Sequence, residues 1–487
     1  MSRLAYCVFA AFVVTFANAT TIKVSTQQDF EALSQTIVRT ISKGEKTISV
    51  NIEAKELTFA DNQISLKDIK RPDVSIAIHG NGVRMTSAGH YVKVLQHPTS
   101  MYMKDGGYYN PWTPFLQLAD TISIVNQQSH ICRITTPVKN RKDQHPQNRF
   151  IHYTCWYTSR TSPVTCIGKD WLEFDGGDWA VPRSGNFYNM NMDYAYAKQF
   201  PRYRLFGTEK VSGKVYECEA STLLCLTNCN LRCFTVDHIC VTGSSQNGAL
   251  IMIDGSQADS IVVSNSIFRC IGGTVLTDRL STNVCFTGNK VDTFIGYGVQ
   301  SGVGSKGAKV TNNTFSNCTL GMKNGFAIQM RSDDFVVSGN TVSDFSYGGI
   351  GVGIWGGTTT NSKCRGIVTG NVLFYTEAFL SDLAQHTLMD SGAIYTWTRT
   401  DGVTISNNYI HDIAGIKDNR GIFCDDGTKN VTITQNRIER IHNSYDIDLR
   451  WSDTYKEQIP DHNIGNKMLG NSTTGKVRFE TQKKQRK

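Results

Sequence analysis

One short frame recurs seven times in the second half of this chain: an asparagine with an apolar residue three positions before it and another two positions after it. The asparagines are Asn265, Asn289, Asn313, Asn340, Asn371, Asn408 and Asn436. They are separated by 24, 24, 27, 31, 37 and 28 residues, a period typical of a coil whose turns each contain two or three short parallel strands. An asparagine at a corner can adopt the left-handed conformation and hydrogen-bond neighbouring backbone. The frame therefore predicts an all-β fold, a parallel β-helix with an asparagine ladder.

A second strand is expected in each interval, and its frame predicts an outward groove. The frame begins at Ile251, Val275, Tyr297, Ile328, Val352, Ile394, Ile422 and Ile447. Side chains alternate across a strand, and the first and third positions are mostly apolar, so the second and fourth face outward. The fourth column is predicted to contain Asp254, Asp278, Gln300, Arg331, Trp355, Trp397, Asp425 and Arg450. Stacked turns place these side chains about 5 Å apart.

The regions around the repeat differ from it in composition. Residues 20–96 are predicted to form a strand–helix–strand cap and the first turns, with the helix over 27–43, because a coil must cover its first exposed turn. Residues 97–233 lose the repeat and are rich in aromatic residues and glycine, so we expect an irregular insertion packed on the coil. The repeats are assigned to 234–465, and residues 466–487 are expected to add a C-terminal strand and a basic tail.

Residues 1–19 have the features of a secretory signal peptide. One positive residue, Arg3, precedes the apolar run Leu4–Phe16, and small residues at Ala17 and Ala19 form a cleavage sequence. The run is too short to span a membrane as a helix, and no later stretch reaches that length. We therefore expect a secreted, periplasmic or cell-surface protein. The net charge of +8 is not accompanied by a basic–aromatic motif, so nucleic acid is not an expected partner.

No metal or other cofactor is expected. Cys225, Cys229 and Cys233 are spaced by four residues, but a run entering the coil gives no reason for them to converge on one point, so structural or disulfide roles are favoured over a metal cluster. Asp254 and Asp278 are stacked acids with the oxygen ligands that calcium prefers, yet no third ligand accompanies them.

Three acids, Asp390, Asp425 and Asp426, are the best candidates for chemistry. Asp390 ends the longest insertion, at about 374–389, and Asp425 is in the outward column one turn further along. Two positioned carboxylates are sufficient for glycosidic cleavage, one as general acid and the other as nucleophile or base. Arg450 is expected to hold Asp425 ionised, whereas crowding by Asp426 favours a protonated form. The alternative is a purely structural role, because Asp-Asp-Gly is a good turn sequence.

Aromatic and basic side chains are expected beside these acids. Exposed indole and phenyl rings would offer flat apolar faces on which the C–H faces of sugar rings can stack. The candidate substrate-binding residues are Trp355, Tyr395, Trp397, Phe423, Arg331 and Arg450. The extra residues at about 374–389 are expected to overhang this site as a lid, because insertions in repeat proteins gather on the functional face.

The repeat over about 234–451 resembles right-handed parallel β-helix proteins. Within it, Asp-Ser-Gly-Ala-Ile-Tyr (390–395) followed by Gly-Ile-Phe-Cys-Asp-Asp-Gly (421–427) looks like the secreted β-helix glycoside hydrolases related to families 120 and 141. That resemblance implies two catalytic acids on the coil, here Asp390 and Asp425, and plant or algal polysaccharides as substrates, including xylan- and fucose-containing ones. The chain departs from the polygalacturonase pattern, because its Asp-Asp pair has no His-Gly or Arg-Ile-Lys signature downstream, and from most β-helix lyases, because it has no evident calcium cluster with a neighbouring Lys or Arg base.

The leading hypothesis is a glycoside hydrolase that binds a polysaccharide or oligosaccharide along the outward columns and uses two carboxylates. The first alternative is a polysaccharide lyase acting on an acidic glycan, with Arg331 or Arg450 neutralising a uronate. The second is a non-catalytic glycan-binding or adhesion coil, because a fold alone does not decide function.

Overall fold

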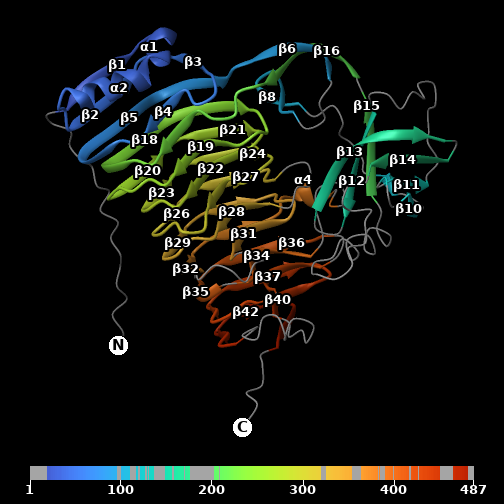
Figure 1. Ribbon diagram of the computed structural model, residues 1–487. Helices are drawn as coiled ribbons and strands as arrows, with labels where there is room; N and C mark the ends of the chain where they lie inside the picture. Colours follow the sequence, from blue (N-terminus) through green and yellow to red (C-terminus); the bar gives the residue numbers. More distant parts are fainter. Residues whose placement is uncertain are drawn as a thin grey trace, which may run out of the picture.

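The protein is a coil of stacked parallel β-strands, here described by a computed structural model (Figure 1). The described residues are 19–95, 100–109, 117–118, 121–126, 129, 131–135, 149–155, 158–168, 170–175, 202–207, 209–319, 325–353, 364–381, 383, 390–398, 400–415, 418–425, 427–449 and 464–480. Two long parallel sheets of 21 and 11 strands run along the coil. Their inward side chains form one continuous apolar core, as the apolar positions of the repeat predict.

Each repeated turn contributes one strand to the 11-stranded sheet and then two strands to the 21-stranded sheet. The 11-stranded sheet consists of β4 (Ile64–Lys67), β17 (Leu224–Thr227), β19 (Ala249–Asp254), β22 (Thr274–Arg279), β25 (Val299–Ser301), β28 (Phe326–Met330), β31 (Gly348–Val352), β34 (Ser391–Thr396), β37 (Asn419–Cys424), β40 (Tyr445–Leu449) and β43 (Lys476–Phe479). The first series of the larger sheet is β20 (Ser260–Ser264), β23 (Val284–Thr287), β26 (Lys309–Thr311), β29 (Phe335–Ser338), β32 (Cys364–Thr369), β35 (Thr400–Ser406), β38 (Thr432–Thr434) and β41 (Lys467–Leu469). The second series is β21 (Ile267–Ile271), β24 (Lys290–Phe294), β27 (Thr314–Ser316), β30 (Thr341–Ser343), β33 (Val372–Phe374), β36 (Tyr409–Ile413), β39 (Arg437–Ile441) and β42 (Ser472–Thr473).

Two short helices cover the N-terminal end of the coil. The first turns are built from β1 (Thr20–Val24), β2 (Thr47–Ile52), β3 (Glu56–Phe59), β5 (Lys70–Ser87) and β18 (Asn230–Ser244). The helix predicted over 27–43 is present in two pieces, α1 (Gln27–Glu31) and α2 (Leu33–Ser42). Their buried residues, which share one face and join the main core, are Phe30, Leu33, Ile37 and Ile41. This apolar stripe is the signal by which the sequence predicts the cap.

Antiparallel strands form the described part of the insertion. A four-stranded sheet contains β6 (Gly89–Leu95), β7 (Tyr102–Lys104), β8 (Gly107–Tyr108) and β16 (Glu209–Cys218). A seven-stranded sheet, which stands beside the coil in Figure 1, contains β9 (Gln117–Leu118), β10 (Thr121–Asn126), β11 (Ile131–Thr135), β12 (Arg149–Cys155), β13 (Thr158–Ile167), β14 (Trp171–Asp175) and β15 (Arg202–Gly207). Hairpins without a fixed period produce no recurring frame, so the sequence reads this region as irregular.

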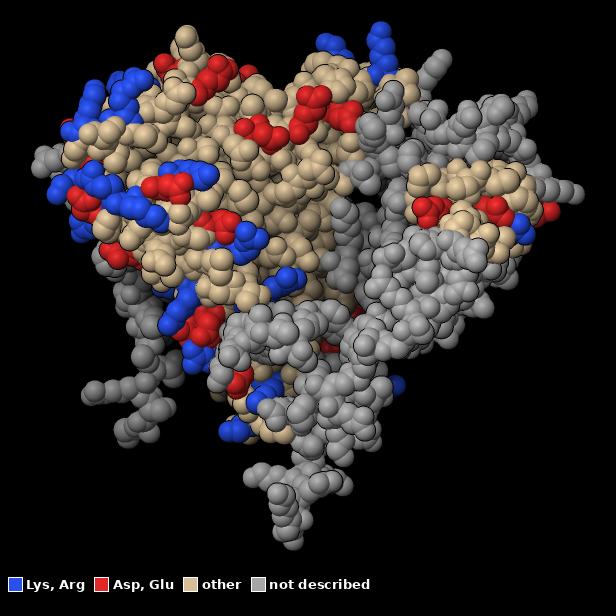
Figure 2. All heavy atoms as spheres, in the orientation of Figure 1, with Lys and Arg blue, Asp and Glu red and all other residues tan. Residues whose placement is uncertain are grey.

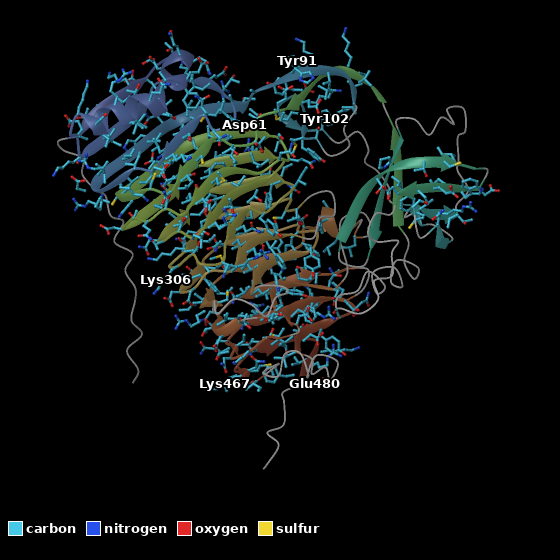
Figure 3. All side chains as sticks on the ribbon, viewed as in Figure 1. Asp61, Tyr91, Tyr102, Lys306, Lys467 and Glu480 are labelled. Carbon is cyan, nitrogen blue, oxygen red and sulfur yellow. The ribbon has the colours of Figure 1, made fainter. Side chains whose placement is uncertain are left out.

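The chain leaves the coil after β5 and returns before β17, which pairs in parallel with β4. Asp61 fastens this junction: its carboxylate accepts hydrogen bonds from the backbone N–H (2.6 Å) and hydroxyl (2.8 Å) of Ser221 and from the backbone N–H of Thr222 (3.0 Å). Asp61 lies at the N-terminal end of the coil, where the two antiparallel sheets branch away (Figure 3). The insertion is thus held at both of its ends by neighbouring turns.

The asparagine ladder is present, with one shift at its beginning. In each step an asparagine Oδ1 accepts from the backbone N–H and the Nδ2 of the asparagine one turn before it; from Asn313 to Asn340 both distances are 3.0 Å. The ladder consists of Asn289, Asn313, Asn340, Asn371, Asn408, Asn436 and Asn471. Asn265 is not a member, because Ser266 occupies the equivalent place and donates its N–H to Asn289. The left-handed conformation belongs to the residue before each ladder position, such as Asn312 at φ 55°.

Charged side chains of both signs are interspersed over the face of the coil in Figure 2, so the net positive charge is not gathered there. Within the described part of the chain, no helix is both long and apolar enough to cross a bilayer.

Candidate functional site

Five neighbouring strands, β28, β31, β34, β37 and β40, carry the predicted acids on what we call the outer face. Each strand, together with the residue directly after it, has up to three described positions that face away from the core. Neighbouring residues, such as Ile350 and Ile394, point into the core. The outward sets are Phe326, Gln329 and Arg331; Gly348, Gly351 and Gly353; Gly392, Tyr395 and Trp397; Arg420, Phe423 and Asp425; and Tyr445 with Asp448.

The register of three strands differs from the predicted frame. Ile251 pairs with Leu276 rather than Val275, Leu276 pairs with Val299 rather than Tyr297, and Ile328 pairs with Ile350 rather than Val352. Three positions of the predicted fourth column therefore change. Asp278 faces inward and is 1% exposed, and Gln300 lies in the neighbouring column. Gly353 takes the place predicted for Trp355. The corner loops between sheets vary in length, and that variation shifts the frame from turn to turn.

An aromatic cluster covers the centre of the outer face. Its members are Phe326, Tyr347, Tyr395, Trp397 and Phe423, each between 2% and 6% exposed. Phe326 stacks on Trp397 with ring centres 5.3 Å apart, and Tyr395 meets Trp397 and Phe423 edge-on at 4.9 Å each. The expectation of exposed rings is therefore wrong for Tyr395, Trp397 and Phe423, because they bury one another. Aromatic pairs in such geometry stabilise the face on which the acids sit.

A turn without outward side chains makes room for this cluster. All three outward positions around β31 are glycines, Gly348, Gly351 and Gly353. A Cβ at Gly348 would lie 2.3 Å from Cε1 of Phe326, and a Cβ at Gly351 would lie 2.7 Å from its Cγ. The Phe326 ring therefore lies over the bare backbone of β31 and reaches the rings that follow β34. The missing side chains are what allow residues two turns apart to stack.

Asp425 is joined to the aromatic cluster through a phenol. The Tyr395 hydroxyl donates a hydrogen bond to Oδ2 of Asp425. Burial, with the charges of Asp425 and Asp390, raises the pKa of Tyr395 well above its usual range, so the phenol stays protonated and remains a donor. The charges of both acids contribute to this rise in the pKa of Tyr395, so both carboxylates lie near this phenol on the outer face. A carboxylate that accepts such a bond is stabilised in its ionised form.

Asp390 belongs to a chain of ion pairs that crosses four turns. Nη1 of Arg420 lies 3.0 Å from Oδ1 of Asp390, and its Nε lies 2.7 Å from Oδ2 of Asp448. Asp448 is also held by Arg478, at 2.6 Å and 2.8 Å. Burial opposes the charge of Arg420, but Asp390 and Asp448 outweigh it and raise the pKa of the guanidinium. Arg420 is fully buried and its Cζ lies 3.8 Å from the centre of the Phe423 ring.

The sequence reasoning missed Arg420 and Asp448. Both occupy outward positions in strands whose other residues are mostly apolar, and a charged residue within such a strand is the signal that could have revealed them. A buried charge is retained in a fold only when it is paired. Once the strand register is known, Arg420 must lie beside Gly392, which leaves space for its side chain.

The remaining predicted residues divide into two groups. Asp390 and Asp425 are partly exposed, with 27% of the Asp390 side chain accessible, and Arg331 lies half-buried on the outer face. Three candidates lie outside the described residues: Asp426, Trp355 and Arg450. Of the predicted lid, α4 (Glu377–Leu380) is described, and its Phe379 packs on Tyr375 at 4.7 Å; the last residues of that insertion are outside the description.

Cysteines and acids do not assemble into a metal centre in the described part of the chain, where no group of three or more suitable side chains converges. Cys225 and Cys229 are buried as free thiols. Burial raises the pKa of the Cys229 thiol, which keeps it in the neutral form that a structural cysteine adopts.

Comparison with known proteins agrees with the architecture. The family model described as right handed beta helix region matches residues 297–455. A solved structure titled "Glycoside hydrolase" aligns with a TM-score of 0.60 at 11% identity, covering 93% of this chain and 97% of that one. The fold is thus a right-handed parallel β-helix. At this level of identity, the likeness extends to the fold and not to the reaction.

Two further structures align over most of the chain with low scores. The gp54 tailspike of Acinetobacter baumannii bacteriophage AP22, in complex with a capsular saccharide, is 10% identical with a TM-score of 0.23, covering 92% of this chain and 79% of that one. The DFA-IIIase of Arthrobacter chlorophenolicus A6, in complex with DFA-III, is 11% identical with a TM-score of 0.28, covering 92% and 90%. Curated proteins yielded no sequence match.

Proposed function

We propose that the protein is a secreted carbohydrate-active enzyme, a glycoside hydrolase that cleaves a polysaccharide or oligosaccharide on the outer face. The observation that carries the proposal is the pair of partly exposed carboxylates near Tyr395: Asp425 accepts a hydrogen bond from its hydroxyl, and the charge of Asp390 also raises the pKa of that phenol. Two carboxylates on one face match the requirement of glycosidic cleavage for an acid and a nucleophile or base. Export rests on the signal-like sequence of residues 1–19.

We assign the two acids different roles. Asp425 accepts a hydrogen bond from the Tyr395 hydroxyl, which favours the ionised carboxylate that a nucleophile or base requires. Asp390 is paired with Arg420, whose second partner Asp448 is also held by Arg478, so the ion pair favours the ionised state of Asp390 as well. Asp390 is the more accessible carboxylate bound to Arg420, so we assign it the general-acid role, which requires it to take up a proton in the substrate complex. Arg420 then acts as a positioning residue.

The test is the activity of Asp390→Asn and Asp425→Asn on a panel of plant and algal polysaccharides, measured as release of reducing ends. Each variant should lose about 10²–10⁴-fold in rate, since each removes one proton-transfer or nucleophilic group. Asp254→Asn is the matched control, because Asp254 occupies the same outward column several turns away and is paired with Arg279 at 2.9 Å. Its activity should equal that of the wild type.

The alternatives give different results in the same experiment. Full activity in either Asn variant would exclude the two-carboxylate assignment. Products that absorb in the ultraviolet as unsaturated sugars would identify a polysaccharide lyase instead. Glycan binding by the wild type with no release of reducing ends would identify a binding or adhesion coil.

A further inference from the structure

Three buried donors on the outer face have no acceptor among the described residues: Nε of Arg331, Nε1 of Trp397 and Nη2 of Arg420. Trp397 is 5% exposed and Arg420 is fully buried. Buried polar groups in folded proteins are almost always hydrogen-bonded, and each exception requires an explanation. Arg420 is already paired with Asp390 and Asp448, so Arg331 and Trp397 are the two donors that point to acceptor groups supplied by a bound molecule.

Arg331 differs from Arg279, the other arginine described in its column. Arg279 occupies the equivalent outward position two turns earlier and forms a two-point ion pair with Asp254, at 2.9 Å and 3.2 Å. Arg331 has no ion pair with any described residue. Its charge acts on the partly buried Tyr297, where it opposes the effect of burial, which raises the pKa of that phenol. A half-buried guanidinium with no counter-ion among the described residues is a binding group for an anion.

No side chain of the same column stands between Arg331 and Trp397, although the Phe326 ring lies over the neighbouring column of β31 and stacks on Trp397. Gly353 is the only residue of their column between them, and consecutive turns are about 5 Å apart, so the two backbones are about 10 Å apart. A guanidinium fork pairs with carboxylate or sulfate through two parallel hydrogen bonds, and an indole N–H donates one more. Arg420 is excluded from this anion site, because Asp390 and Asp448 already balance its charge.

We infer that Arg331 and Trp397 form a subsite for an anionic sugar, and that the substrate is therefore an acidic glycan carrying carboxylate or sulfate groups. This inference rests on the proposed function for its link to cleavage. Asp425 lies in the same column one turn beyond Trp397 and three turns beyond Arg331, about 15 Å from the latter. The anionic group recognised by Arg331 thus belongs to a sugar some distance from the bond that is cleaved.

The experiment measures binding by calorimetry, with the full-length Asp425→Asn protein to prevent cleavage. The probes are oligosaccharides of matched length: oligogalacturonate for carboxylate, carrageenan fragments for sulfate and xylo-oligosaccharides as the neutral reference. At least one anionic probe should bind about tenfold more tightly than the neutral one, and its affinity should fall as salt is added. Whichever anionic probe binds more tightly identifies the group.

Variants at Arg331 assign the effect to the subsite. Arg331→Gln should lower the affinity for the anionic probe about 10–100-fold, with the neutral probe unaffected, and Arg331→Lys should restore part of the affinity because it keeps the charge. Arg279→Gln is the matched control and should bind as the parent does. If Arg331→Gln misfolds, as judged by its melting curve, the Lys variant and the salt dependence still decide.

Equal affinity for neutral and anionic probes, or unchanged binding in Arg331→Gln, would overturn the inference. Its failure is distinguishable from failure of the proposed function. Cleavage of neutral glycans by the wild type without preference for acidic ones would leave a hydrolase without this subsite. If the wild type binds an acidic glycan through Arg331 but never cleaves it, the subsite is supported and the proposed hydrolase activity is not.

Discussion

At the residue scale, the inward carboxyl of Asp278 is the clearest effect of the shifted register. Predicted to face outward, it lies in the core and accepts a hydrogen bond from the backbone N–H of Gly302 at 3.0 Å. Burial raises its pKa to about 7, although Ser301, Gly302 and Ser305 oppose the shift. Because the unfolded chain would give the ordinary value of 3.8, the folded protein binds a proton here that the unfolded chain has lost. The stabilisation is complete below about pH 4 and is lost as the pH rises through about 7.

Asp278→Asn should remove this pH dependence. Asparagine keeps an acceptor for Gly302 and has no proton to lose, so the variant should be more stable than the wild type at pH 8, by about 2–4 kcal/mol, and similar to it at pH 4. The measurement is urea unfolding across this range. Asp254→Asn, an outward acid of the preceding turn, should retain the wild-type profile. An identical pH profile in Asp278→Asn would show that the buried carboxyl is not the cause.

At the element scale, β31 provides bare backbone on which neighbouring side chains pack and contributes no outward side chain of its own. Its outward glycines leave bare backbone, over which Phe326 extends to stack on Trp397. The strands on either side then carry the rings and the acids. The glycine-rich sequence Gly348–Gly353 therefore has a structural reason in the packing of its neighbours, and the arrangement of the cluster depends on it.

Gly351→Ala tests this role. A methyl group at this position would lie 2.7 Å from Cγ of Phe326, so the ring must move. We expect destabilisation of about 1–3 kcal/mol and an altered near-ultraviolet circular dichroism spectrum, because the aromatic contacts change. Gly107→Ala serves as the control, since its nearest contact would be an ordinary 3.7 Å. An unchanged spectrum and melting temperature would mean that the ring does not depend on the bare strand.

At the scale of the whole molecule, the two ends of the coil are unlike. The N-terminal turn is covered by α1 and α2, whose apolar residues join the core. At the other end, marked by Lys467 and Glu480 in Figure 3, the inward residues Met468 and Val477 are 37% and 39% exposed. Their partners one turn earlier, Ile433 and Ile447, are fully buried. In a coil, each turn is stabilised mainly by its neighbours, so the end whose described inward residues are exposed is the weaker.

Hydrogen exchange should therefore show a gradient along the coil. Backbone amides of β41, β42 and β43 should exchange fastest among the parallel strands, those of β26 to β36 slowest, and those of β1 and β2 should be protected by the helical cap. Mass spectrometry of peptic peptides resolves these segments. Equal protection at β41–β43 and in the central turns would contradict the gradient and indicate cooperative unfolding of the entire coil.

The coil itself could be predicted because its signals are local. A strand alternates every two residues, a ladder asparagine lies at one corner of its turn, and the helix over 27–43 shows its apolar stripe within a few turns. Asp425 and Trp397 were placed outward correctly for the same reason. Even the error at Asn265, one residue from the true ladder position of Ser266, is a local ambiguity between adjacent polar residues.

Sequence alone therefore determined the repeating turn and which side chains in most strands face in or out, since both depend on spacing within a few residues. Only the tertiary structure decided which residues stack across turns, because the lengths of the corner loops set the register and neighbouring turns set those loops. That register buried Asp278, closed the rings of Tyr395, Trp397 and Phe423 against one another over a strand of glycines, and placed Arg420 between Asp390 and Asp448. Unlike the asparagine ladder, these contacts join different residue types that occur once each, so no repeated frame in the sequence reveals them.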